Sequence, residues 1–137
     1  MRCVKSESDW AAMHALRCSV ERAFGLVDAE TVARFVDDIR RKCERLDGQW
    51  WLARHGSEPV GEIGFVPFAL GDLAVARLQD VDVVPHHQQK GFGNELLAWA
   101  ISHAAASGID ALCLMAKADD WPKDWYASHG FFQLGET

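Results

Sequence analysis

The chain has 137 residues, of which 49% are hydrophobic and 25% charged, and this composition predicts one globular domain over residues 1–137 rather than a disordered chain or a coiled coil. The formal net charge of −6 argues against nucleic acid as a main partner. No apolar run is long enough to cross a bilayer and the first residues lack the apolar core of a signal peptide, so we expect a cytoplasmic protein with no membrane partner.

Two helices are predicted after a short first strand at Met1–Lys5. Ser6 and Asp9 form a capping-box pattern in which Asp replaces the usual Glu or Gln. Gly25 should end the first helix, and the second helix should begin near Asp28. The apolar residues that support the two helices recur at helical spacing: Trp10, Met13, Leu16, Val20 and Phe24, then Val32, Phe35, Val36, Ile39, Cys43 and Leu46.

Three strands should follow these helices. Gln49–Arg54 and Pro59–Phe68 flank a turn-like segment and are typical of an antiparallel hairpin. Gly71-Asp72 turns the chain again into Leu73–Val84, which is predicted to be the longest strand.

A glycine-rich turn comes next, between the apolar run Val81–Pro85 and a predicted helix at Asn94–Ser107. Its sequence is Gln88-Gln89-Lys90-Gly91-Phe92-Gly93. Glycine can take positive φ and lets a ligand approach the backbone, and the first N–H groups of a helix have no partner within it. The junction therefore predicts a phosphate-binding turn.

The last part of the chain should add a strand, a short helix and a strand. Ala111–Ala116 is wholly apolar, as expected of a central strand. Trp121-Pro122 should begin the helix, His129-Gly130 should end it, and Phe131–Leu134 should form the last strand. This order of elements predicts an α/β (α+β) fold in which helices pack on a mixed sheet.

These residues resemble the GNAT superfamily of N-acetyltransferases. Its Gln/Arg-x-x-Gly-x-Gly/Ala motif is matched by Gln88, Gly91 and Gly93, and a second motif by the pair Trp125-Tyr126 with Gly130-Phe131. The resemblance implies a mixed, mostly antiparallel central sheet flanked by helices. It also implies transfer of an acetyl group from acetyl-coenzyme A to a primary amine of a small molecule.

The resemblance further implies where the coenzyme binds. Amides from about Gln89 to Asn94 would hold the pyrophosphate, and the edge at Val83–Pro85 would pair with the pantetheine arm as an added strand does. Asp119 stands where relatives often have an Asn that contacts pantetheine. The full set of expected coenzyme-binding residues is Val83, Val84, Pro85, Gln88, Gln89, Lys90, Gly91, Phe92, Gly93, Asn94 and Asp119.

Catalytic roles follow in part from the same resemblance. The backbone amide of Val83 would bind the thioester oxygen, and Tyr126, the only tyrosine of the chain, would be the general acid. The general base stays open among Asp80, Asp82, Glu62 and a chain of water molecules.

Further expectations concern metals and partners. His86 and His87 should point to opposite faces of an extended segment, so no metal site is expected. Because seven residues follow Gly130, the edge of the sheet should be open or covered in a homodimer. Two other functions stay open: a catalytically impaired module that binds acetyl-coenzyme A in a regulatory role, and acetylation of a protein N-terminus or lysine.

Overall fold

A computed structural model describes residues 1–25 and 28–136, and its centre is a five-stranded sheet in the order β1-β2-β3-β4-β5. Neighbouring strands are antiparallel except β4 and β5, which are parallel. The strands are β1 (Arg2–Cys3), β2 (Gln49–His55), β3 (Glu58–Leu70), β4 (Leu73–Val83) and β5 (Ala111–Cys113). The helices are α1 (Glu7–Ala23), α2 (Ala29–Arg45), α3 (Phe92–Ala106) and α4 (Pro122–Ser128), with a 3-10 turn η1 (Pro85–His87).

Helix α1 begins as its sequence predicts. The Ser6 hydroxyl accepts a hydrogen bond from the Asp9 amide at 3.1 Å, and the Asp9 carboxylate accepts one from the Ser6 amide at 2.9 Å. The capping box is therefore complete with Asp in the third position, and it satisfies two amides at the helix start. Asp28 caps α2 without a capping box: its carboxylate accepts a hydrogen bond from the Glu30 amide at 3.1 Å.

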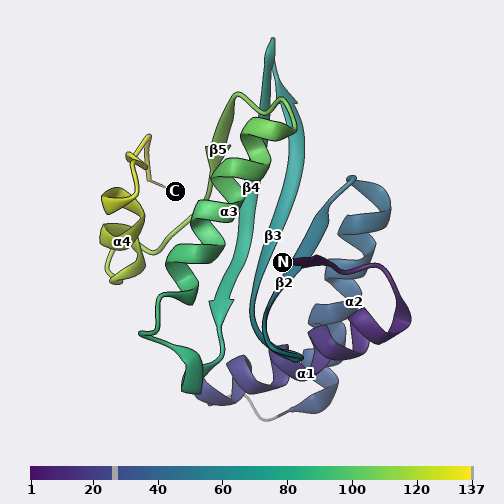
Figure 1. Ribbon diagram of the computed structural model, residues 1–137. Coiled ribbons are helices and arrows are strands. Elements are labelled where there is room, and N and C mark those ends of the chain that lie inside the picture. Colours follow the sequence, from purple (N-terminus) through teal and green to yellow (C-terminus); the bar gives the residue numbers. More distant parts are fainter. Residues whose placement is uncertain (26–27, 137) are drawn as a thin grey trace.

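The two faces of the sheet bury separate apolar clusters. Helices α1 and α2 cover one face (Figure 1), where Met13 of α1 packs with Trp50 and Leu52 of β2. Helix α3 covers the other face, where Leu96 and Leu97 pack on β3 and β4. Side chains of a strand alternate between faces, so the central strands contribute to both clusters. The expected mixed, mostly antiparallel sheet between helices is confirmed.

The last third of the chain departs from the prediction. Strand β5 ends at Cys113 rather than Ala116, and it lies at the edge of the sheet rather than in its centre. Phe131–Leu134 forms no strand. Within these residues Phe131 packs against the Tyr126 ring, whereas Phe132 is 80% exposed. The apolar sequence of this segment predicts a strand, but no backbone pairing joins it to the sheet in the described residues.

Two bounds in the middle of the chain also differ from expectation. The longest strand is β3, with 13 residues, whereas β4 has 11 and ends at Val83. Helix α3 begins at Phe92, so Gly93 lies inside its first turn. Gly91 precedes the helix with φ of 87°, which is the positive value that the turn was predicted to need.

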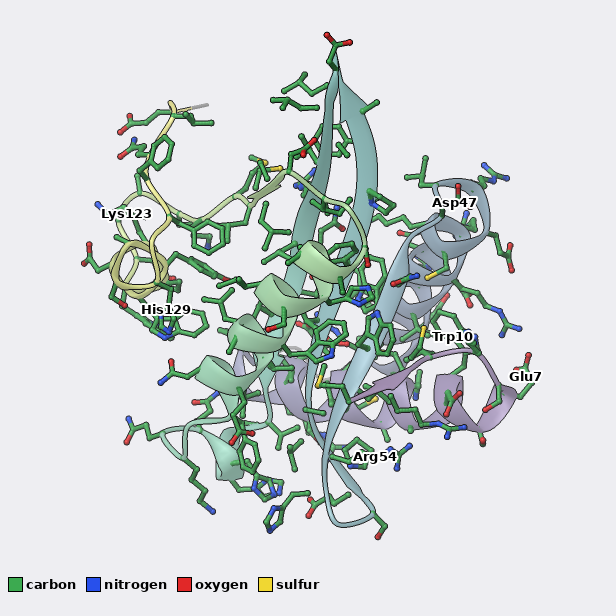
Figure 2. The ribbon with its side chains drawn as sticks, turned by 45° about the horizontal axis from the view of Figure 1, so that its top comes forward. Glu7, Trp10, Asp47, Arg54, Lys123 and His129 are labelled. Atoms are coloured by element: carbon green, nitrogen blue, oxygen red, sulfur yellow. The ribbon has the colours of Figure 1, made fainter. Side chains whose placement is uncertain are left out.

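Helix α4 lies at the margin of the molecule, where its Trp125 and Tyr126 pack against the apolar cluster under α3. Figure 2 shows Lys123 of α4 and the adjoining His129 on the opposite side from Glu7 and Trp10 of α1. Helix α4 has no fully buried residue. Among the helices of residues 1–25 and 28–136, none combines the length and apolar character that a membrane crossing requires.

Candidate functional site

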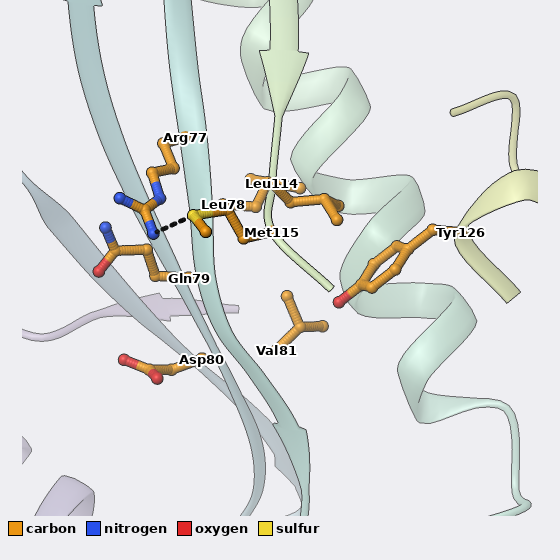
Figure 3. Close-up of a pocket in the computed structure, with 8 residues that line it drawn as sticks. All are labelled: Arg77, Leu78, Gln79, Asp80, Val81, Leu114, Met115 and Tyr126. Atoms are coloured by element: carbon orange, nitrogen blue, oxygen red, sulfur yellow. Dashed lines mark hydrogen bonds between the residues drawn. The ribbon is translucent and has the colours of Figure 1, made fainter. Parts of the chain in front are cut away.

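Strands β4 and β5 pair at one end and separate at the other. They pair through three positions, from Val75 with Ala111 to Arg77 with Cys113. Strand β5 ends there, whereas β4 continues to Val83. A cavity of about 270 Å³ lies at the separation, lined by Arg77, Leu78, Gln79, Asp80, Val81, Leu114, Met115 and Tyr126 (Figure 3). The edge of β4 is thus left for another molecule to pair with.

A β-bulge in β4 coincides with the separation. Gly64 of β3 pairs with Gln79 and Glu62 pairs with Asp82, so β4 has one more residue than β3 between these pairs. Asp80 lies in this bulge with φ of 49°, a left-handed value that Asp tolerates better than most residues. A bulge bends its strand and increases the local twist, which accounts for the divergence of β4 from the short β5.

Val83, Val84 and Pro85 at the end of β4 were predicted to bind the coenzyme. Of these three, only Val83 has a backbone N–H that can donate a hydrogen bond away from β3, toward the cavity. The Val84 amide already donates to Val60 of β3 at 2.9 Å, and Pro85 has no N–H. Because successive peptide groups of a strand face alternate edges, the N–H of Val83 faces away from β3. The Gln88 side chain donates to the Val83 carbonyl oxygen at 3.1 Å, which ties the glycine turn to the strand.

The glycine turn exposes the start of α3. Gly91 has no side chain to cap the first amides of the helix, and a Cβ added there would meet no atom within 4 Å. The amides of Phe92, Gly93 and Asn94 therefore have no partner within the helix, and the N-cap residue supplies no side-chain bond to them. The predicted residues Gln88, Gln89 and Lys90 are exposed just before them, whereas the side chain of Phe92 packs into the core.

Helix α4 brings Tyr126 to the same side of the molecule. Trp125 donates from its indole nitrogen to the Asn94 side-chain oxygen at 2.8 Å, which joins α4 to the start of α3. The Tyr126 hydroxyl points into the cavity beside Val81 (Figure 3). Burial and the negative charge of Asp82 raise the pKa of Tyr126 to about 12, so the phenol keeps its proton at neutral pH. Asp119 lies in an exposed turn outside the cavity lining.

A buried group of charges occupies the opposite face of β4, where α1 crosses it. Arg17 donates to Glu62 at 2.6 Å and to Asp82 at 2.7 Å, and it also pairs with Glu21. Glu62 is fully buried, and burial raises its pKa to about 8. Burial raises the pKa of Asp82 as well. Glu62 and Asp82 therefore hold a proton more readily than free carboxylates do.

Arg17 and Glu21 were not predicted as site residues, although the sequence contained a signal for them. Both lie on the apolar face of α1, next to Met13, Leu16 and Val20. A charged residue on a core-facing stripe needs a buried partner of opposite charge. The sequence could therefore have predicted a buried ion pair, but not which carboxylates of β3 and β4 form it.

A second cavity, of about 280 Å³, opens beside these charges. Its lining comes from α1, α2 and the β4 bulge: Arg17, Glu21, Phe35, Asp38, Ile39, Lys42 and Asp80. Asp80 also lines the first cavity, and Figure 3 shows Asp80 and Tyr126 on opposite sides of β4. The bulge is thus the boundary between an open cleft with backbone donors and a cavity with acidic side chains.

Comparison with known proteins gives the same fold. A family model described as an acetyltransferase (GNAT) domain matches residues 46–133, which include both sequence motifs.

Several solved structures have a similar fold. One is a GCN5-related N-acetyltransferase from Ralstonia eutropha JMP134, which is 22% identical in sequence. It aligns with a TM-score of 0.72, and the alignment covers 95% of this chain and 90% of that one. An acetyltransferase of Trypanosoma brucei is 19% identical, with a TM-score of 0.69 and coverage of 99% and 94%. Glucosamine-6-phosphate N-acetyltransferase from Arabidopsis thaliana is 15% identical, with a TM-score of 0.68 and coverage of 99% and 94%. At identities this low, the structural similarity shows a common fold. It does not show that the proteins share an acceptor substrate.

Proposed function

Because the chain belongs to the GNAT acetyltransferase family, we propose that it transfers an acetyl group from acetyl-coenzyme A to a primary amine of a small molecule. The observation that carries this proposal is the β4 bulge, which has the Tyr126 cleft on one side and the acidic cavity on the other. A two-substrate reaction needs two binding regions that meet at the reacting atoms.

Coenzyme binding is proposed at the edge of β4 and the start of α3. The amides from Gln89 to Asn94 would hold the pyrophosphate, since a helix start provides N–H donors and a favourable dipole for anions. The pantetheine amides would pair with β4 as an added strand, down to Val83. The exposed Lys90 would add positive charge near the phosphates, and Asp119 is assigned a lesser contact from its turn.

The residues around the bulge suit the three needs of acyl transfer from a thioester. The N–H of Val83 would donate to the oxygen of the thioester carbonyl, where negative charge develops. Tyr126, which is protonated at neutral pH, would give a proton to the leaving sulfur. The attacking amine must lose a proton, and Glu62 and Asp82, in their ionised forms, are proposed to take it through water. Burial raises the pKa of each group, and a carboxylate with a raised pKa is a stronger base than an ordinary one.

The acceptor is proposed to be small and cationic before it reacts. The second cavity has a volume of about 280 Å³, just below the usual range of about 300–1,000 Å³ for small-molecule sites. Its lining includes Glu21, Asp38 and Asp80 against Arg17 and Lys42, and Arg17 is already engaged by buried carboxylates. An ammonium group is attracted to such a surface.

The direct experiment measures thiol release from acetyl-coenzyme A with a panel of small amines. We expect release with at least one amine, and we expect Tyr126→Phe to lower kcat about a hundredfold or more while the affinity for acetyl-coenzyme A is unchanged. Trp121→Phe is the matched control, because Trp121 is an exposed aromatic next to α4 that lies outside the cavity lining.

Other outcomes separate the alternatives. Tight coenzyme binding without thiol release for small amines or peptides would identify a binding module instead. Thiol release only with peptides would indicate that the acceptor is a protein N-terminus or lysine. Equal kcat for the wild type and Tyr126→Phe would remove Tyr126 from the mechanism.

A further inference from the structure

Two histidines just before the glycine turn lie on the same side as a glutamate of β3. His86 and His87 belong to η1, which has three residues per turn, so their side chains are about 120° apart rather than opposite as in a strand. The expectation that they face away from each other is therefore wrong. Their rings lie 4.4 Å apart, and both reach Glu58, the first residue of β3.

The donor atoms of these three residues have the spacing of metal ligands. Nε2 of His86 lies 3.0 Å from one Glu58 oxygen, and Nε2 of His87 lies 3.4 Å from the other. One donor atom from each residue can be chosen so that all lie within 4.8 Å of one another. Tetrahedral zinc with bonds near 2.0–2.1 Å separates its ligand atoms by about 3.3 Å, which is close to the two observed separations.

His87 supplies an independent reason to expect a ligand. The residue is 8% exposed, and its Nε2 atom is buried with no hydrogen-bond partner in the part of the chain that the structure describes. The nearby Glu58 oxygen does not align with it well enough for a hydrogen bond. A buried nitrogen without a partner destabilises the folded state, and coordination to a cation would remove that cost.

We propose that Glu58, His86 and His87 bind a zinc ion. Two imidazole nitrogens with one carboxylate favour zinc or a metal of similar ligand preference, whereas Mg²⁺ and Ca²⁺ prefer sets of oxygen ligands. The ion would join the β2–β3 hairpin to the segment that leads into α3. His87 also packs edge-on against Phe92, the first residue of α3, with ring centroids 5.6 Å apart. Zinc would thus brace the start of α3 whether or not the transferase proposal is correct.

The test is zinc titration of the full chain after treatment with a chelator, followed by calorimetry and by the thermal unfolding midpoint. We expect one ion per chain, and we expect Glu58→Gln and His86→Ala each to weaken binding by about tenfold or more. Both side chains are more than half exposed, so these variants should fold. Zinc should raise the unfolding midpoint of the wild type, because a ligand that binds only the folded state stabilises it.

His14→Ala is the matched control. His14 lies on α1 with its Nδ1 atom 3.8 Å from the Cys18 sulfur, so that pair is a second potential zinc ligand set. We expect this variant to bind zinc like the wild type. The proposal is overturned if Glu58→Gln and His86→Ala bind zinc as tightly as the wild type does, or if zinc affects the unfolding midpoints of wild type and Glu58→Gln equally.

Discussion

Strand β4 separates two regions of the molecule. We call one the closed side, where charged side chains are buried next to the second cavity, and the other the open side, where the edge of the strand is unpaired. On the side of α1, Asp82 joins a buried charge group in which Arg17 contacts several carboxylates. On the side of β5, the same strand leaves its edge unpaired beyond Arg77 in the described residues, and α4 buries no residue fully. On the closed side the buried charges pair mostly with one another, although Arg17 Nε and one Glu62 oxygen have no hydrogen-bond partner in the described residues. The open side offers backbone groups to a ligand. Stability and binding should therefore respond to different substitutions.

The strongest test of the closed side is Arg17→Met. This change leaves Glu62 and Asp82 buried without their counter-ion, and removal of one partner from a buried ion pair costs about 3–5 kcal/mol. Urea unfolding measures the loss. Arg34→Met is the control, because Arg34 pairs with Glu30 on the surface of α2 and such a pair contributes about 0.3–0.5 kcal/mol. Similar losses in the two variants would mean that the buried charges contribute little.

A second test compares two glycines, one on each side. An added Cβ at Gly64 would lie 2.5 Å from the buried Trp50 ring, whereas at Gly93 it would lie 3.4 Å from Trp125. We expect Gly64→Ala to lower the free energy of unfolding by about 1–3 kcal/mol. Gly93→Ala, in the first turn of α3, should leave it unchanged or raise it by up to about 1 kcal/mol. A tolerated Gly64→Ala would show that the closed side repacks easily.

A third test of the same buried charges depends on pH. Glu62 has its pKa raised from 4.5 to about 8, so the folded state binds the proton more tightly than the unfolded state does. Its contribution to stability is then present at low pH and decreases as pH rises from about 4.5 to about 8. Glu62→Gln removes this dependence. The measurement is the free energy of unfolding of the wild type minus that of Glu62→Gln. This difference should be smaller at pH 8 than at pH 5. An equal difference at the two pH values would contradict the raised pKa.

How well the sequence predicts a feature depends on how far apart in the chain its residues lie. Local patterns predict local features well: the capping box of Ser6, the β2–β3 hairpin and the positive φ of Gly91 were all expected and are all present. These features depend on residues close together in the chain, so their signals lie within a few positions.

Features that depend on distant segments were not predicted. The bulge at Asp80 has no glycine or proline to mark it, and it becomes visible only from the pairing of β4 with β3. Strand β5 is short because β4 bends away from it, which its own apolar sequence does not reveal. The sequence predicts extended chain at His86 and His87, whereas the structure has a 3-10 turn there, and this turn brings both imidazoles close to Glu58.

Hydrogen–deuterium exchange with and without acetyl-coenzyme A tests the central claim most directly, because it reads backbone amides on both sides of β4. The account predicts slower exchange at Val83 and across Gln89–Asn94 when the coenzyme is present, with little change in α1 around Arg17. Unchanged exchange in both open-side segments under saturating coenzyme, or slowing confined to α1 and α2, would contradict the claim that the open side is the coenzyme site.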